Sequence, residues 1–336
     1  MHILVTGGAG FIGSHLCEKL IDENHRVISI DNLSTGNYRN IEHLVNRKDF
    51  TFVFDTIENE AVLDRIISDV DLIFHLAAAV GVDLIVKDPV NVIRSNVLGT
   101  EIVLKTANRY RKKTIIASTS EVYGKSENVP FREDDDSILG PTTKNRWSYA
   151  CSKLIDEFSA LAYYHKYHLP VVITRFFNTV GPRQTGRYGM VIPRMITQAL
   201  QNKPLTVFGT GKQKRCFCHV SDIIGALIKL SNMETAVGNI YNIGSTDEIT
   251  IENLAKKIKL LTKSNSELKY ISYDEAYEAG FEDIMRRVPS IDRIHRLIGF
   301  EPKICLDDII KNMITYEKTK LTHKSEQSKI SYKTDM

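Results

Sequence analysis

The sequence predicts an α/β protein built on a doubly wound parallel sheet, with a smaller α/β substrate-binding lobe. Three observations support this class. Short apolar runs alternate with stretches of helical period, and the first run leads directly into a glycine-rich turn. The length of 336 residues suits two lobes, at roughly 100 to 200 residues per domain. The apolar fraction of 43% and the charged fraction of 25% are those of an ordinary globular protein.

Six apolar runs of strand length define the expected sheet. They occupy residues 3–5, 27–30, 52–54, 72–76, 114–118 and 171–177. Near-continuous apolar runs of this kind are typical of parallel strands that are covered on both faces. Helices are expected between the strands at Phe11 to Ile21, Pro89 to Tyr110 and Ser148 to Tyr167. Right-handed crossovers would place these helices on the faces of the sheet.

The alternation of apolar runs and helical stretches stops after residue 177, and a loop rich in Gly and Arg spans residues 181–189. A helix at 191–201, a strand at 205–208, a helix after Ser221 and a strand at 240–243 follow, so the chain visits a second lobe and returns. We expect a cofactor-binding lobe made of residues 1–178 and 219–245, and a substrate-binding lobe made of residues 179–218 and 246–317. The polar, Lys-rich residues 318–336 are expected to form a disordered tail.

Charge and cysteine content limit the partners and the compartment. The chain has 44 Lys and Arg against 41 Asp and Glu, and the tail of five lysines, one glutamate and one aspartate accounts for the whole net charge of +3. A neutral body does not favour nucleic acid. No apolar run approaches the roughly 20 residues of a membrane span, so no membrane partner is expected. The five scattered cysteines suit the reducing cytoplasm. Cys216, Cys218 and His219 lack a second ligand cluster, so no metal site is predicted.

The glycine-rich turn predicts a dinucleotide site. Gly7, Gly10 and Gly13 lie between the first strand and the first helix. In a Rossmann arrangement, such glycines permit the tight turn, the approach of a pyrophosphate to the backbone, and close packing of helix on strand. Asp31 ends the second strand 18 residues beyond Gly13. A carboxylate there accepts a hydrogen bond from the free 2′-hydroxyl of NAD and repels the 2′-phosphate of NADP. NAD is therefore the predicted cofactor.

A tyrosine and a lysine four residues apart, Tyr149 and Lys153, would project from one face of a helix. An ammonium beside a phenol, together with a positively charged nicotinamide, favours the phenolate, so the pair is predicted to be the base that oxidises a hydroxyl group. The fifth strand ends in Thr119, Ser120 and Glu121, at the carboxyl edge where ligands of a parallel sheet lie. These three residues are therefore candidate catalytic residues.

Together these motifs resemble the extended short-chain dehydrogenase/reductases, a family of nucleotide-sugar epimerases and dehydratases. The likeness rests on TGGAGFIG at 6–13, HLAA at 75–78, STSEVYG at 118–124, the Tyr149–Lys153 pair and RFFNTVGPR at 175–183, and it extends to about residue 315. It implies that Thr119, Tyr149 and Lys153 oxidise the C4 hydroxyl of a UDP-sugar to a 4-keto intermediate, with hydride passing to NAD. It also implies a homodimer built on the helices at 89–110 and 148–167.

The resemblance also assigns further contacts. Asp55 and Ile57 would hold the adenine, and Asn96 would support the cofactor-binding lobe. The residues expected to bind NAD are Gly7, Gly10, Phe11, Ile12, Gly13, Asp31, Asn32, Asp55, Ile57, Leu76, Ala77, Ala78, Asn96, Tyr149 and Lys153. The residues expected to bind the nucleotide-sugar are Asn178, Arg183, Val191, Val207, Arg215 and Arg287.

Glu121 narrows the expected chemistry, because simple 4-epimerases of this family usually carry a small or hydroxyl side chain at its position. STSEVYG and the segments 211–217 and 286–291 are most similar to UDP-glucuronate decarboxylases. Decarboxylation of a 4-keto uronate, or other C5 or C6 chemistry with Glu121, is therefore expected. The alternatives are a UDP-sugar 4-epimerase, acting for example on UDP-glucose or UDP-glucuronate, and a UDP-N-acetylhexosamine dehydratase-like enzyme. A non-catalytic NAD-binding sensor is least favoured, because it could dispense with the catalytic residues.

Overall fold

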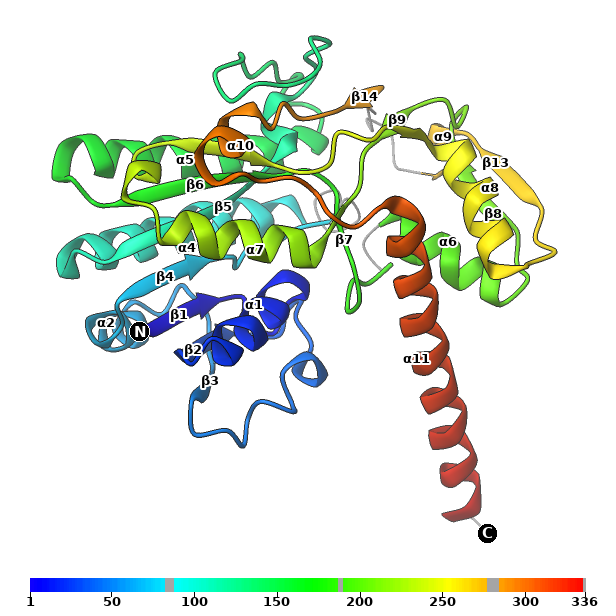
Figure 1. Ribbon diagram of the computed structural model, residues 1–336, viewed down its shortest axis with the longest axis horizontal. Helices are drawn as coiled ribbons and strands as arrows, with labels where there is room; N and C mark the ends of the chain where they lie inside the picture. Colours follow the sequence, from blue (N-terminus) through cyan, green and yellow to red (C-terminus); the bar gives the residue numbers. More distant parts are fainter. Residues whose placement is uncertain (82–87, 187–189, 277–283, 335–336) are drawn as a thin grey trace.

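The computed structural model describes residues 1–81, 88–186, 190–276 and 284–334, which form two lobes (Figure 1). A parallel seven-stranded sheet in the order β11-β6-β5-β4-β1-β2-β3 is the centre of the larger lobe. Its strands are β1 (His2–Thr6), β2 (Arg26–Asp31), β3 (Phe50–Phe54), β4 (Leu72–His75), β5 (Lys113–Thr119), β6 (Val171–Phe176) and β11 (Ile240–Ile243). The order reverses between β1 and β4, and ligands of such sheets bind at the carboxyl ends of the strands beside this reversal.

Helices cover both faces of the sheet. One face carries α1 (Phe11–Asp22), α7 (Val220–Ser231) and α10 (Asp292–Ile298), and the other carries α2 (Glu60–Asp69), α4 (Pro89–Tyr110) and α5 (Arg146–Tyr167). Each side has its own apolar core, with Leu16 and Leu227 buried on the first and Leu63 and Val103 on the second. The predicted doubly wound α/β class is confirmed.

Local chemistry explains why the sequence indicated α4 so well. Asp88 caps the helix, because its side chain accepts a hydrogen bond from the Asn91 N–H, and Pro89 stands in the first turn, where its missing N–H costs nothing. The helix ends when Arg111 adopts the left-handed conformation, with φ of 55°. The residues that start and stop the helix are thus inside it or directly next to it, and the predicted and observed bounds agree.

The smaller lobe packs three helices around short strands. Its helices are α6 (Val191–Leu200), α8 (Ile251–Thr262) and the first part of α11 (Leu306–Thr334), which share one apolar core. The strands β8 (Leu205–Phe208) and β13 (Leu268–Ile271) pair in parallel, and α9 (Tyr273–Ala276) follows them. The remaining short strands are β7 (Thr179–Val180), β9 (Lys214–Arg215), β10 (Cys218–His219), β12 (Ile249–Thr250) and β14 (Arg286–Arg287). Strand β9 lies between β12 and β14.

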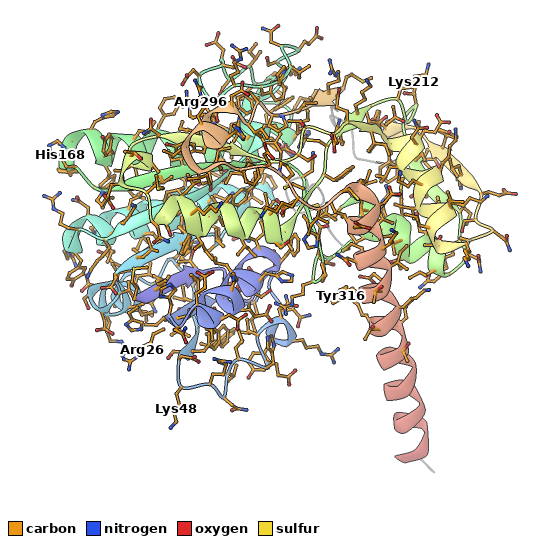
Figure 2. The ribbon with its side chains drawn as sticks, in the orientation of Figure 1. Arg26, Lys48, His168, Lys212, Arg296 and Tyr316 are labelled. Carbon is orange, nitrogen blue, oxygen red and sulfur yellow. The ribbon has the colours of Figure 1, made fainter. Side chains whose placement is uncertain are left out.

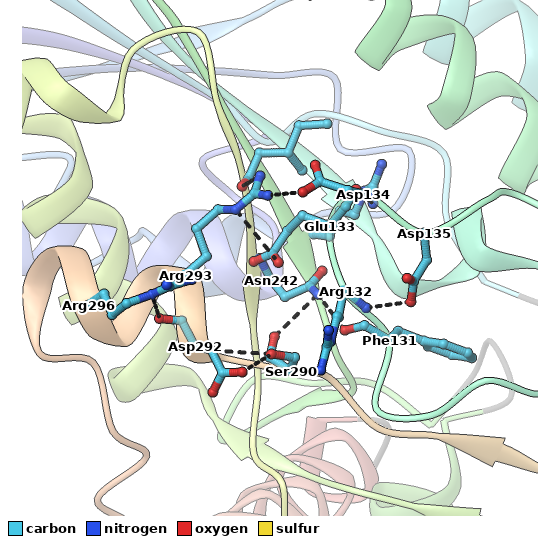
Figure 3. A network of polar contacts seen from close by, with 12 residues as sticks. Phe131, Arg132, Glu133, Asp134, Asp135, Asn242, Ser290, Asp292, Arg293 and Arg296 are labelled. Atoms are coloured by element: carbon cyan, nitrogen blue, oxygen red, sulfur yellow. Dashed lines mark hydrogen bonds and ion pairs between the residues drawn. The ribbon is translucent and has the colours of Figure 1, made fainter.

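The segment from Val288 to Phe300 differs from the expected division, which gave all of residues 246–317 to the substrate lobe. Ile294 and Phe300 are buried in the same core as α1 and α7 of the cofactor lobe. Polar contacts reinforce the return, because the Asn242 amide donates to the carbonyls of Phe131 (2.9 Å) and Ser290 (3.3 Å). Figure 3 shows this network, with Arg293 of α10 reaching toward the loop after Phe131.

Helix α11 continues to Thr334 and so includes most of the segment for which a disordered tail was expected. Residues 303–334 contain no Gly or Pro, and their Lys, Glu and Gln residues favour a helix once packing has started it. Lys320 and Glu317 form an ion pair one turn apart at 3.4 Å. Among the described residues, no helix is long and apolar enough to cross a bilayer.

Candidate active site

A cavity of about 880 Å³ lies between the lobes at the carboxyl ends of the sheet strands. The larger lobe contributes the glycine turn after β1, the ends of β2, β4 and β5, and one face of α5. The smaller lobe contributes the start of α6 and residues of β8, β9 and β14. The volume is within the range of small-molecule and cofactor sites, and the position is the one expected for a ligand of a doubly wound sheet.

The glycine turn is shaped so that a side chain would not fit. Gly7 has φ of +70°, and a Cβ on Gly13 would lie 2.2 Å from the Gly7 carbonyl oxygen. The close approach of α1 to β1 therefore needs glycine at position 13. Gly10 precedes α1 without any capping side chain, so the partial positive charge of the helix N-terminus faces the cavity. This turn fits a dinucleotide pyrophosphate.

Asp31 closes the other side of the turn. Its carboxylate accepts hydrogen bonds from the Ala9 N–H at 3.0 Å and the Leu33 N–H at 2.8 Å, and it lines the cavity. Burial raises the pKa of Asp31 above its ordinary value, while the backbone donors act in the opposite direction. A carboxylate fixed beside the glycine turn fits the ribose hydroxyls of NAD.

Every expected NAD residue except Asn96 lines the cavity. Asn96 is instead buried beneath it, where the side-chain oxygen accepts from the Ala79 N–H at 2.8 Å and the amide donates to Ser152 at 3.1 Å. It therefore ties α4 to α5 and to the chain after β4, which is the supporting role that the resemblance implies. Asp55 accepts a hydrogen bond from the Thr56 N–H at 2.7 Å and lines the cavity.

Tyr149 and Lys153 lie on α5 beside the end of β5, where the Tyr149 hydroxyl hydrogen bonds to Thr119. Burial raises the pKa of Tyr149 above its ordinary value, and the Glu121 carboxylate raises it further; Thr119 and Arg287 act in the opposite direction. Both Tyr149 and Lys153 line the cavity, together with Thr119 and Ser120. The structure thus assembles a buried phenol, a hydroxyl and an ammonium at the position of a hydroxyl-oxidising centre.

Glu121 is held between two arginines. Arg146 Nη1 lies 2.8 Å from Glu121 Oε2, and Arg287 Nη1 lies 3.0 Å from Glu121 Oε1. Burial alone would raise the pKa of this carboxyl, but the two guanidinium groups lower it to about 2. Glu121 is therefore ionised at neutral pH. In this geometry it neutralises arginines, whereas the proton transfer at C5 expected from the sequence requires a carboxyl that can also be protonated.

The expected substrate residues separate into those at the cavity and one beneath it. Arg215 and Arg287 are register partners on β9 and β14, and both line the cavity. Asn178, Arg183 and Val191 line it as well, with Arg183 paired to Glu18 of α1. Val207 does not line it, because its side chain is fully buried in the apolar core of the smaller lobe.

Residues 4–313 match the family model described as GDP-mannose 4,6 dehydratase. The chain belongs to this nucleotide-sugar epimerase and dehydratase family. It is an NAD-dependent enzyme of the extended short-chain dehydrogenase/reductases, as its motifs indicated.

Relatives of the enzyme include several decarboxylases. It is 40% identical to UDP-N-acetyl-alpha-D-glucosaminuronate decarboxylase of Bacillus cytotoxicus, over 93% of this chain and 96% of the relative. It is 35% identical to UDP-glucuronic acid decarboxylase 1 of Xenopus tropicalis, over 98% of this chain and 75% of the relative.

Solved structures similar to the enzyme include epimerases. UDP-glucuronic acid 4-epimerase of Bacillus cereus, in complex with UDP-glucuronic acid and NAD, has a TM-score of 0.86 and 29% identity, covering 95% of this chain and 99% of that one. UDP-glucose 4-epimerase of Thermotoga maritima has a TM-score of 0.85 and 30% identity, covering 96% and 100%.

Several cavity residues of the enzyme were not predicted from its sequence. Arg146 is the most important, and its signal was available, because it lies three residues before Tyr149 and therefore on the same side of α5. Tyr316 and Lys320 of α11 also line the cavity, although Lys320 belongs to the segment expected to be disordered. Figure 2 labels Tyr316 on α11, where this helix passes the gap between the lobes.

Proposed function

We propose that this enzyme decarboxylates a UDP-uronate after oxidising it at C4. The charge around Glu121 carries the proposal. Arg146 and Arg287 both lie against Glu121, which places two buried guanidinium groups beside Tyr149. Guanidinium groups bind carboxylates through strong charge-assisted hydrogen bonds. The C6 carboxylate of a uronate would accept such bonds, whereas the hydroxymethyl group of a neutral hexose carries no charge.

The residues of the site support a simple sequence of steps. Tyr149 would take the proton of the C4 hydroxyl, with Thr119 hydrogen bonding to the phenol to orient it. When bound, NAD supplies the acceptor for the C4 hydride. The oxidised sugar is a β-keto acid, so the electrons of the C5–C6 bond can pass into an enolate as CO₂ leaves, and C5 then takes up a proton. Arg146 and Arg287 would hold the carboxylate in place until the bond breaks.

The named relatives support this choice and define its competitors. Decarboxylases of UDP-glucuronic acid and of UDP-N-acetylglucosaminuronate are similar over nearly the whole chain, which supports a substrate with a hydroxyl or an acetamido group at C2. A UDP-glucuronic acid 4-epimerase with a TM-score of 0.86 supports 4-epimerisation as a second candidate. The same positive charge fits its uronate substrate, and the two reactions differ in whether the carboxyl group is kept.

The test is incubation of the enzyme and NAD⁺ with UDP-glucuronate, UDP-N-acetylglucosaminuronate, UDP-glucose and UDP-N-acetylglucosamine, followed by mass spectrometry of the products. We expect a uronate to lose CO₂. A change of configuration without change of mass would refute decarboxylation in favour of epimerisation, and action on the neutral sugars alone would refute the charge argument. Arg146→Met should reduce turnover of the uronate while leaving the fold intact by circular dichroism.

We also propose a homodimer formed through α4 and α5. These helices pack together, and their outer surface carries exposed apolar side chains that a second copy would cover. Val90 is 75% exposed and Phe158 is 72% exposed, and Ile93, Leu98 and Ile155 are exposed as well.

A cytoplasmic location is supported by the five cysteines, all of which are free thiols.

A further inference from the structure

Lys153 has a buried partner that the steps above do not use. Asp156 lies one turn further along α5, and its Oδ2 atom is 2.6 Å from Lys153 Nζ. The two side chains are only 2% and 1% exposed. Among the residues that the structure describes, Asp156 is the only carboxylate within ion-pair distance of Lys153. The ammonium therefore depends on this single residue for its counter-charge.

The other carboxylates near the Lys153–Asp156 pair interact with arginines. Glu157, the next residue on α5, accepts from Arg175 at 2.7 Å and from Ser118 at 2.5 Å. Glu121 is held by Arg146 and Arg287, as described above.

The histidine of β4 completes the surroundings. His75 faces Lys153, and burial lowers the pKa of His75 to about 3, so it is neutral at physiological pH. The His75 ring hydrogen bonds to Thr6 at 2.8 Å and to Thr100 of α4 at 3.0 Å. Neutral groups thus enclose the Lys153–Asp156 pair on the sides of α4 and β4.

We propose that Asp156 is a positioning residue for sugar oxidation, which orients the Lys153 ammonium, supplies its counter-charge and so sets the pH range in which Tyr149 works. A buried ammonium without a counter-ion is costly and loses its proton readily. The proposal rests on the C4-oxidation step of the proposed function, and it is independent of whether the oxidised sugar then loses CO₂.

The Asp156 charge acts on the pH profile through Tyr149. A negative charge disfavours the phenolate, and Asp156 is one of the groups that raise the pKa of Tyr149. Removing the charge should therefore lower the pKa of Tyr149. The rising limb of the profile, where Tyr149 loses its proton, would move toward lower pH.

The experiment compares Asp156→Asn with the wild-type holoenzyme in the pH dependence of kcat/KM for the sugar substrate. We expect the rising limb of the profile to move by about one pH unit toward acid, the lower end of what one neighbouring charge does. Asp156→Glu keeps the charge and should restore the wild-type profile. Asp64→Asn removes a surface charge of α2 and should leave the profile unchanged. A lower kcat at an unchanged pH optimum would overturn the proposal.

Cofactor binding gives a readout that does not depend on the reaction. The nicotinamide of NAD⁺ is positively charged and that of NADH is neutral, so loss of the Asp156 charge should weaken NAD⁺ by about tenfold and leave NADH nearly unchanged. Titration calorimetry with NAD⁺ and with NADH measures both affinities, and equal weakening of the two would also overturn the proposal.

If the Asn variant does not fold, Asp156→Ser, which leaves room for water at the ammonium, carries the same expectations. Wild-type enzyme that converts no UDP-sugar would refute the proposed function, and the binding comparison would still decide the role of Asp156.

Discussion

Changing Glu121 to glutamine keeps the shape of the side chain and removes the negative charge that Arg146 and Arg287 share. Against the effect of burial, the two arginines lower the pKa of Glu121 from 4.5 to about 2. One pKa unit corresponds to about 1.4 kcal/mol, so the ionised carboxylate contributes roughly 3 kcal/mol to the free energy of unfolding at neutral pH. We expect Glu121→Gln to lose about this amount at pH 7, a cost typical of breaking a buried pair.

The loss should depend on pH with a definite sign. Because the pKa of Glu121 is lower in the folded state than in the unfolded state, its stabilisation is complete well above pH 4.5 and disappears as the pH falls from there toward 2. At about pH 3 the unfolded carboxyl is mostly protonated while the folded one is still mostly ionised. Roughly 2 of the 3 kcal/mol are then already lost. The difference between wild type and variant should therefore shrink from about 3 to about 1 kcal/mol.

Urea unfolding followed by circular dichroism at pH 7 and pH 3 measures both values. Other carboxylates titrate equally in the two proteins, so the difference isolates Glu121. Glu248→Gln is the matched control, because Glu248 pairs with Arg286, the neighbour of Arg287, at a site where the arginine is 49% exposed. It should change stability by less than about 1 kcal/mol at either pH. A difference between wild type and Glu121→Gln that stays constant with pH would refute the reasoning.

Three further predictions concern the cofactor and the assembly. Gly13→Ala should abolish NAD binding by calorimetry, because the new Cβ would lie 2.2 Å from a carbonyl oxygen; retained affinity would contradict the described turn. Asp31→Asn keeps an acceptor for the Leu33 N–H but removes the charge that repels a 2′-phosphate, so NADP should gain about tenfold relative to NAD, and an unchanged ratio would exclude this role. Phe158→Glu should convert a dimer to a monomer in sedimentation, and dimers of undiminished affinity would rule out the α4–α5 surface.

The sheet and the catalytic pair could be predicted because their signals are local. Apolar runs mark buried parallel strands wherever they occur, and the ends of α4 are set by residues inside or next to the helix. The family resemblance implied that Thr119 and Tyr149 act together, and a doubly wound sheet explains why they can, because the end of one strand and the start of the next helix lie at one edge.

Features that depend on distant partners were harder to predict. Val207 lies on a strand whose side chains alternate between buried and partly exposed, and only the neighbouring Phe208 reaches the cavity, so the local pattern does not show which residue would line it. The return of residues 288–300 to the cofactor lobe depends on contacts with Asn242 and the loop after Phe131. The composition of residues 318–336 predicts a disordered tail because it contains few apolar residues, whereas the extent of α11 depends on the packed core in which that helix starts.

The position of β14 has a mechanical consequence. Arg286 and Arg287 pair with β9 of the smaller lobe, and the backbone on either side of Pro289 bonds to Phe131 of the larger lobe, through Val288 at 2.8 Å and Ser290 at 2.7 Å. Arg287 is therefore fastened to both lobes within three residues. Any separation of the lobes would have to break either the pairing of β14 with β9 or the bonds to Phe131, so the arginine that holds Glu121 lies at the joint between the two lobes.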